Sequence, residues 1–161
     1  MSKLRDRYER LTEAAAAPSK ARPVVLATLA VRVDPTAERM AIDSALEASV
    51  ALVLVNLIPL PFYGTTMVLV GHQGTTLPHE EDLDAVRATA ARAAELGVRT
   101  ELLRVRTRRP VPALLQVLSE RDAGLLVFGP DLSRTSGRRF RRTAKRIRRE
   151  ADCLVWIAPD G

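Results

Sequence analysis

The chain has 161 residues, of which 47% are hydrophobic and 27% charged, with one cysteine and a formal net charge of +6. This balance excludes a fully disordered chain, and the length suits one domain that buries its core without cross-links. The single cysteine, Cys153, excludes a disulfide framework and a four-thiolate metal site. No apolar run approaches the roughly 20 residues of a membrane helix, and we find no secretory signal, so we expect a cytoplasmic protein without a membrane span.

Residues 1–22 differ in composition from the rest of the chain. They are charged as far as Glu13, continue with four alanines, and then contain Pro18 and Ser19. This pattern predicts a short charged helix or flexible segment followed by a linker. We therefore divide the chain into an N-terminal extension, residues 1–22, and an α/β domain, residues 23–161.

From residue 23 onward, apolar stretches typical of buried strands alternate with stretches of helical periodicity. The expected strands are residues 23–29, 51–58, 98–105, 124–128 and 153–158. The expected helices are residues 34–49, 80–96, 111–121 and 138–151. Asp34 followed by Pro35 marks a helix start, and Gly97 marks a helix end. The stretch 62–78 is ambiguous, with a short strand at 67–70 as one interpretation.

The order of these elements predicts the fold class. Strands separated by helices pair in parallel through right-handed crossovers. We therefore predict an α/β fold, with a single open five-stranded, mainly parallel sheet and helices on both faces. In such Rossmann-like sheets ligands bind beyond the C-terminal ends of the strands. The loops expected there are residues 30–36, 59–78, 107–112 and 129–137.

The positive charge is concentrated in one segment. Nine of the 25 basic residues lie between Arg134 and Arg149, and without them the chain has 16 basic and 19 acidic residues. Such a segment can bind a polyanion or nucleic acid through phosphates. However, Phe140 is the only aromatic residue among the arginines, and no helix-turn-helix or zinc spacing accompanies it. A solvated helix face, or an arginine bias from GC-rich coding sequence, explains the same pattern.

The part of the chain from residue 23 to residue 158 resembles the universal stress protein family. The resemblance is carried by residues 98–118 and above all by residues 123–157. The latter contain a strand, Gly129, a loop with Ser136 and Gly137, a basic helix, and an Ala-Asp-Cys sequence ending at Cys153 before the last strand. The resemblance implies the fold predicted above and a binding or regulatory role in a stress response, without enzymatic activity.

Family members that bind ATP carry an aspartate at the end of the first strand and three glycines in a phosphate loop, the last one followed by Ser or Thr. Here Gly129 matches the first glycine, but Leu132 replaces the second. Counting forward from Gly129, Arg142 and Thr143 stand where the family has the last glycine and the Ser or Thr after it. Counting back from Cys153, Arg141 and Arg142 do so.

The first-strand aspartate of the family also has no clear counterpart. Even spacing back from Pro59 places Leu29 at that position, and Asp34 fits only if the strand is longer. Small residues are needed in the phosphate loop because backbone N–H groups must approach the phosphates closely. We therefore expect ATP binding to be weakened or lost, and we assign no other cofactor.

Two alternatives remain open. One is an ATP or nucleotide site in which Arg108, Arg109, Arg141 and Arg142 replace backbone donors. The other is polyanion or nucleic-acid binding through residues 134–149. If an anion or nucleotide binds, the resemblance implies that particular residues hold it. They are Asp34, Gly129, Ser136, Gly137, Arg142 and Thr143.

The remaining reactive side chains suggest no catalytic or metal site. His72 and His79 lack a cluster of ligands, and Cys153 opens a buried strand as a packed thiol. With Trp156, Cys153 belongs to an apolar edge strand, residues 153–158, which needs a cover. In many members of the family this strand pairs with its twin. We therefore expect a homodimer through residues 153–158, with the N-terminal extension as an alternative cover.

Overall fold

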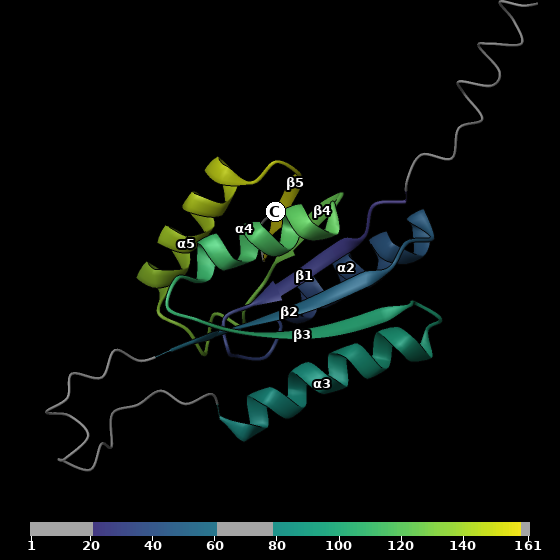
Figure 1. Ribbon diagram of the computed structural model, residues 1–161. Coiled ribbons are helices and arrows are strands. Elements are labelled where there is room, and N and C mark those ends of the chain that lie inside the picture. Colours follow the sequence, from purple (N-terminus) through teal and green to yellow (C-terminus); the bar gives the residue numbers. More distant parts are fainter. Residues whose placement is uncertain (1–20, 61–78, 159–161) are drawn as a thin grey trace, which may run out of the picture.

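The computed structural model describes residues 21–60 and 79–158, which form a five-stranded sheet between two layers of helices (Figure 1). The strands are β1 (Val24–Thr28), β2 (Leu52–Pro59), β3 (Thr100–Thr107), β4 (Leu125–Phe128) and β5 (Leu154–Ile157). The helices are α2 (Pro35–Ala48), α3 (Glu80–Glu95), α4 (Pro110–Arg121) and α5 (Gly137–Glu150). All pairings are parallel, in the order β3-β2-β1-β4-β5.

This arrangement confirms the predicted fold class, and the bounds of each element agree to within about two residues. The predicted extension, apart from residues 21 and 22, and the ambiguous stretch 62–78 lie outside the described residues. None of the helices in the described part of the chain is long and apolar enough to cross a membrane.

The sheet has a separate core on each face. Helices α4 and α5 cover one face, and α2 and α3 cover the other, as Figure 1 shows. The central strand β1 is buried along its whole length, which is why it is apolar at every position rather than at every second one. On the α5 side the rings of Phe128 and Phe140 stack with their centroids 5.7 Å apart.

Helix α2 packs closely because its buried face consists largely of alanine. Ala37, Ala41 and Ala45 are buried, whereas Ala48 is exposed at the end of the helix. A Cβ atom on Gly129, just after β4, would lie 2.1 Å from the Cβ of Ala37. Helix α2 therefore reaches the sheet only because residue 129 is a glycine.

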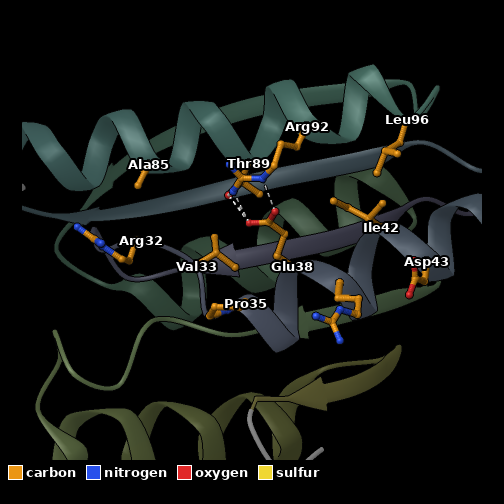
Figure 2. A pocket seen from close by; sticks show the side chains of 11 residues that line it. Arg32, Val33, Pro35, Glu38, Ile42, Asp43, Ala85, Thr89, Arg92 and Leu96 are labelled. Carbon is orange, nitrogen blue, oxygen red and sulfur yellow. Dashed lines mark hydrogen bonds and ion pairs between the residues drawn. The ribbon is translucent and has the colours of Figure 1, made fainter.

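An ion pair joins α2 to α3. Figure 2 shows Glu38 of α2 pointing towards Arg92 and Thr89 of α3. The two carboxylate oxygens accept hydrogen bonds from Arg92 Nε at 2.6 Å and Nη2 at 2.7 Å, and Thr89 Oγ1 donates at 2.7 Å. The bond from Arg92 lowers the pKa of Glu38, although partial burial opposes the shift.

We expect Gly129→Ala to lower the free energy of unfolding by about 1–3 kcal/mol, because the added methyl group overlaps Ala37. The control is Gly137→Ala, where a Cβ meets only Arg141 Nη1 at 3.6 Å and the expected change is below about 0.5 kcal/mol. Urea unfolding of both variants measures the difference. Equal losses would contradict the packing argument.

We expect Glu38→Gln to lower the free energy of unfolding by about 1 kcal/mol at neutral pH, because a charge-assisted contact is lost. The folded pKa of Glu38 is lowered, so its stabilisation is present above the ordinary value of 4.5 and is lost as the pH falls through the lower folded value. The difference in the free energy of unfolding between Glu38→Gln and wild type must therefore disappear at acidic pH. Glu47→Gln, at an exposed position of the same helix, is the control, and a gap independent of pH would refute the assignment.

Candidate functional site

Two buried polar side chains fix the chain where β1 ends. Thr28 and Asn56 are 0% and 1% exposed. Thr28 Oγ1 donates to the carbonyl of Val31 at 2.7 Å, and Asn56 Oδ1 accepts from the N–H of Ala30 at 3.0 Å. These bonds hold Ala30 in the left-handed conformation, with φ of 57°, so the loop turns sharply away from the sheet.

A cavity of about 430 Å³ lies beside this turn. It is bounded by the loop after β1, by Pro59 at the end of β2, by the start of α3 and by the loop between β4 and α5. After β1 the chain continues to β2 on one side of the sheet, and after β4 it continues to β5 on the other side. The strand order therefore reverses between β1 and β4, which is where ligands of α/β sheets bind. We call this cavity the switch-point cavity.

The switch-point cavity contains a buried carboxylate. Asp82 of α3 is 1% exposed, and its Oδ1 accepts from the N–H and the Nε of Arg32, both at 3.2 Å. Arg134 Nε lies 3.6 Å from the same oxygen. These two guanidinium groups offset the cost of burying the charge. The other oxygen, Oδ2, is buried without a hydrogen-bond partner, an arrangement uncommon for buried polar atoms.

Asp82 is not among the predicted site residues, because in the sequence it belongs to an acidic first turn. The signal was present in the helical spacing, because Asp82, Val86, Thr89 and Ala93 are the buried residues of α3. A carboxylate at the head of such a face is buried with the apolar residues that follow it. Its partners Arg32 and Arg134 lie far away in the sequence.

Short polar side chains shape the loop between β4 and α5. Asp131 Oδ1 accepts from the N–H of Ser133 at 2.9 Å and from its hydroxyl at 2.7 Å. The hydroxyl bond lowers the pKa of Asp131. Ser136 caps α5 by accepting from the N–H of Arg139 at 3.5 Å. Ser133 and Ser136 of this loop, together with Arg139 in the first turn of α5, line the switch-point cavity.

Two of the six predicted site residues have structural roles here. Asp34 caps α2, and its Oδ1 accepts from the N–H groups of Thr36 and Ala37 at 2.8 Å and 3.2 Å. Gly129 donates its N–H to the carbonyl of Ala27 and accepts from the N–H of Asp34. Neither group is among those that line the switch-point cavity. Asp34 follows β1 by six residues, so the longer first strand that its assignment needed is absent.

The other four predicted residues lie along α5 but not together. Ser136 lines the switch-point cavity. Gly137 lines a hollow between α5 and β5. Arg142 and Thr143 line a groove of about 540 Å³ between α4 and α5. We call this last feature the arginine groove, because it contains several arginines of α5 and of the loop after β3. They are Arg108, Arg109, Arg139, Arg142 and Arg146.

A further open cavity, of about 530 Å³, lies between α2 and α3 (Figure 2). Its central polar groups are Glu38, Thr89 and Arg92, which bond to one another across the cavity. Because both oxygens of Glu38 already accept hydrogen bonds, this cavity offers a ligand fewer free groups than the switch-point cavity does.

Comparisons with known proteins agree with the architecture. A universal stress protein family structure from Burkholderia pseudomallei has a TM-score of 0.59 at 23% identity, covering 88% of this chain and 99% of that one. A universal stress protein from Archaeoglobus fulgidus in complex with dAMP has a TM-score of 0.53 at 22% identity, covering 84% and 96%. A universal stress protein in complex with cAMP has a TM-score of 0.57 at 20% identity, covering 87% and 98%.

At these identities the structural neighbours establish the fold alone. No curated protein matches the sequence. The model of the universal stress protein family, by contrast, matches residues 20–159, which includes all the described strands and helices. The chain therefore belongs to the universal stress protein family.

Proposed function

We propose that this domain is a nucleotide-binding regulatory module of the cytoplasmic stress response and not an enzyme. The nucleotide occupies the switch-point cavity and is held by side chains rather than by a glycine-rich backbone loop. The observation that carries the proposal is the pairing, in one cavity, of the buried acceptor Asp82 with the cationic side chains Arg134 and Arg139.

Each part of a nucleotide has a matching group in this cavity. The carboxylate of Asp82 accepts a hydrogen bond from a ribose hydroxyl once a small rotation brings Oδ2, which is buried without a partner among the described residues, to the cavity. Arg139 and the N-terminal end of α5 at Ser136 attract the phosphate. Leu29, Ala30 and Val31 supply an apolar wall for the base.

The geometry favours a nucleoside monophosphate over ATP. The N–H of Gly129 is already bonded to Ala27, and Leu132 stands where the family's ATP binders have a second glycine. A triphosphate therefore lacks the backbone donors on which it depends. The dAMP and cAMP complexes among the structural neighbours each contain a ligand with one phosphate. They support a monophosphate ligand here.

A second candidate function is polyanion binding by α5. Arg139 and Arg142 of this helix are exposed and have no ion pair with the described residues. Nucleic acid is disfavoured as the polyanion, because Phe140 stacks on Phe128 in the core and is not free to stack on bases.

We also propose a homodimer through β5. This strand lies at the edge of the sheet, and Leu154 on it is 74% exposed. An exposed apolar edge is a site for strand or side-chain pairing with a second copy.

We expect Arg139→Gln to weaken AMP binding by about tenfold, because one charge-assisted hydrogen bond to phosphate is lost. Arg138→Gln removes the same charge one residue away, at a position outside the switch-point cavity, and is expected to bind like wild type. Isothermal titration calorimetry with AMP and ATP measures both variants.

A second variant, Val31→Trp, tests the cavity itself, because the larger ring fills space beside Ala30. It should abolish AMP binding while the protein still unfolds cooperatively. Unchanged AMP binding in this variant, or ATP binding tighter than AMP binding in wild type, would refute the proposal.

For the dimer, we expect Leu154→Glu to convert the protein to a monomer, because it places like charges at the strand edge. Leu96→Glu is the matched control, since Leu96 is 59% exposed at the end of α3, away from β5. Sedimentation velocity distinguishes the two variants. A wild-type monomer at all concentrations, or a dimer that survives Leu154→Glu, contradicts the proposed interface.

A further inference from the structure

We propose that the arginine groove binds a short chain of phosphates, such as inorganic polyphosphate. This inference rests on the second candidate function, polyanion binding by α5, and assigns that binding to one flank of the helix. It requires no nucleotide in the switch-point cavity.

The groove gathers cations from two separate segments. Arg139, Arg142 and Arg146 of α5 line it together with Thr143, and their spacing of three and four residues places them on one helix face. Arg109, from the loop after β3, lines the other wall. No aspartate or glutamate is among the described residues that line this groove.

Most of these cations lack an internal counter-charge. Arg146 Nε pairs with Glu150 at 3.0 Å. Arg109, Arg139 and Arg142, by contrast, have no ion pair with any of residues 21–60 or 79–158. The Arg92 and Arg121 side chains elsewhere in the fold do pair with carboxylates, at 2.6 Å and 2.7 Å. Arg109, Arg139 and Arg142 therefore converge on the groove without a carboxylate partner among the described residues, and a multiply charged anion relieves their repulsion.

The start of α4 adds to the positive potential. Arg109 is its N-cap residue and forms no side-chain capping bond, and the first turn contains no acidic residue. The positive end of the helix dipole is therefore uncompensated beside the same arginines. Because Pro110 and Pro112 have no N–H group, we assign most of the binding to guanidinium groups.

The lining of the groove selects a ligand without a base. The described residues that line it are arginine, threonine, proline and valine, with no aromatic side chain among them, so they offer a nucleobase nothing to stack on. Guanidinium groups bind phosphate oxygens through two parallel hydrogen bonds. Arg139 also lines the switch-point cavity, so the phosphate tail of a bound nucleotide is a second source of the same chemistry.

The test compares two double variants that remove equal charge from opposite flanks of α5. Arg109→Gln with Arg142→Gln alters the groove. Arg141→Gln with Lys145→Gln alters the flank that faces β5. Isothermal titration calorimetry with inorganic tripolyphosphate is expected to show binding at least about tenfold weaker for the groove variant, and changed less than about threefold for the control. Circular dichroism checks that both variants fold, and the single variant Arg142→Gln replaces the groove variant if it does not.

Three other results are informative. Equal weakening in both double variants overturns the groove assignment and leaves polyanion binding to the whole helix. The proposal is overturned altogether if wild type does not bind tripolyphosphate and the groove variant binds ATP as tightly as wild type does. ATP binding that the groove variant weakens, with AMP binding unchanged, supports a phosphate-chain site and identifies the nucleotide tail as its occupant. AMP titration of wild type tests the switch-point cavity separately.

Discussion

The contact between Ala37 and Gly129 is the constraint on which the arrangement of the loops after β1 and β4 depends. Because residue 129 has no side chain, α2 lies directly against the end of β4. The loops after β1 and β4 are then bonded to each other, since the N–H of Asp34 donates to Gly129 and the N–H of Asp131 donates to Arg32, both at 2.9 Å. Two backbone donors of the loop after β4 are already used, because the N–H of Gly129 is bonded to Ala27 and that of Asp131 to Arg32.

In the proposed nucleotide site, side chains rather than backbone N–H groups therefore contact the ligand. Asp82 enters the site from α3, and two arginines compensate its buried charge. A buried carboxylate with one oxygen unpaired is costly unless a ligand or solvent donor satisfies it. In the nucleotide site proposed above, this carboxylate is the acceptor for a ligand hydroxyl. The Asp82 side chain thus belongs both to the buried face of α3 and to the lining of the switch-point cavity.

Local sequence patterns were sufficient to predict the fold but not the site. The continuous apolar stretches of β1 and β2, and the Asp34-Pro35 start of α2, depend on neighbouring residues only, and these features are confirmed. The environment of Asp82 depends on Arg32 and Arg134, each about 50 residues away, and no periodicity within α3 reports such partners. Gly129 is the opposite case. It matches the first glycine of the family's phosphate loop, but its packing against Ala37 explains why a glycine stands there.

The abundance of arginine carries little information by itself, because a coding bias supplies arginine wherever a cation is tolerated. The distribution of carboxylates is more informative. Helix α5 contains eight basic residues and one acidic residue, Glu150, whose pKa is lowered by its bonds to Arg149 and Arg146. Helix α3 instead combines both signs and pairs across to α2 through Arg92 and Glu38. A bias towards arginine does not remove glutamate and aspartate from one helix and retain them on another. Helix α5 therefore carries many cations with a single carboxylate beside them, which is the charge distribution that the proposed phosphate-chain site requires.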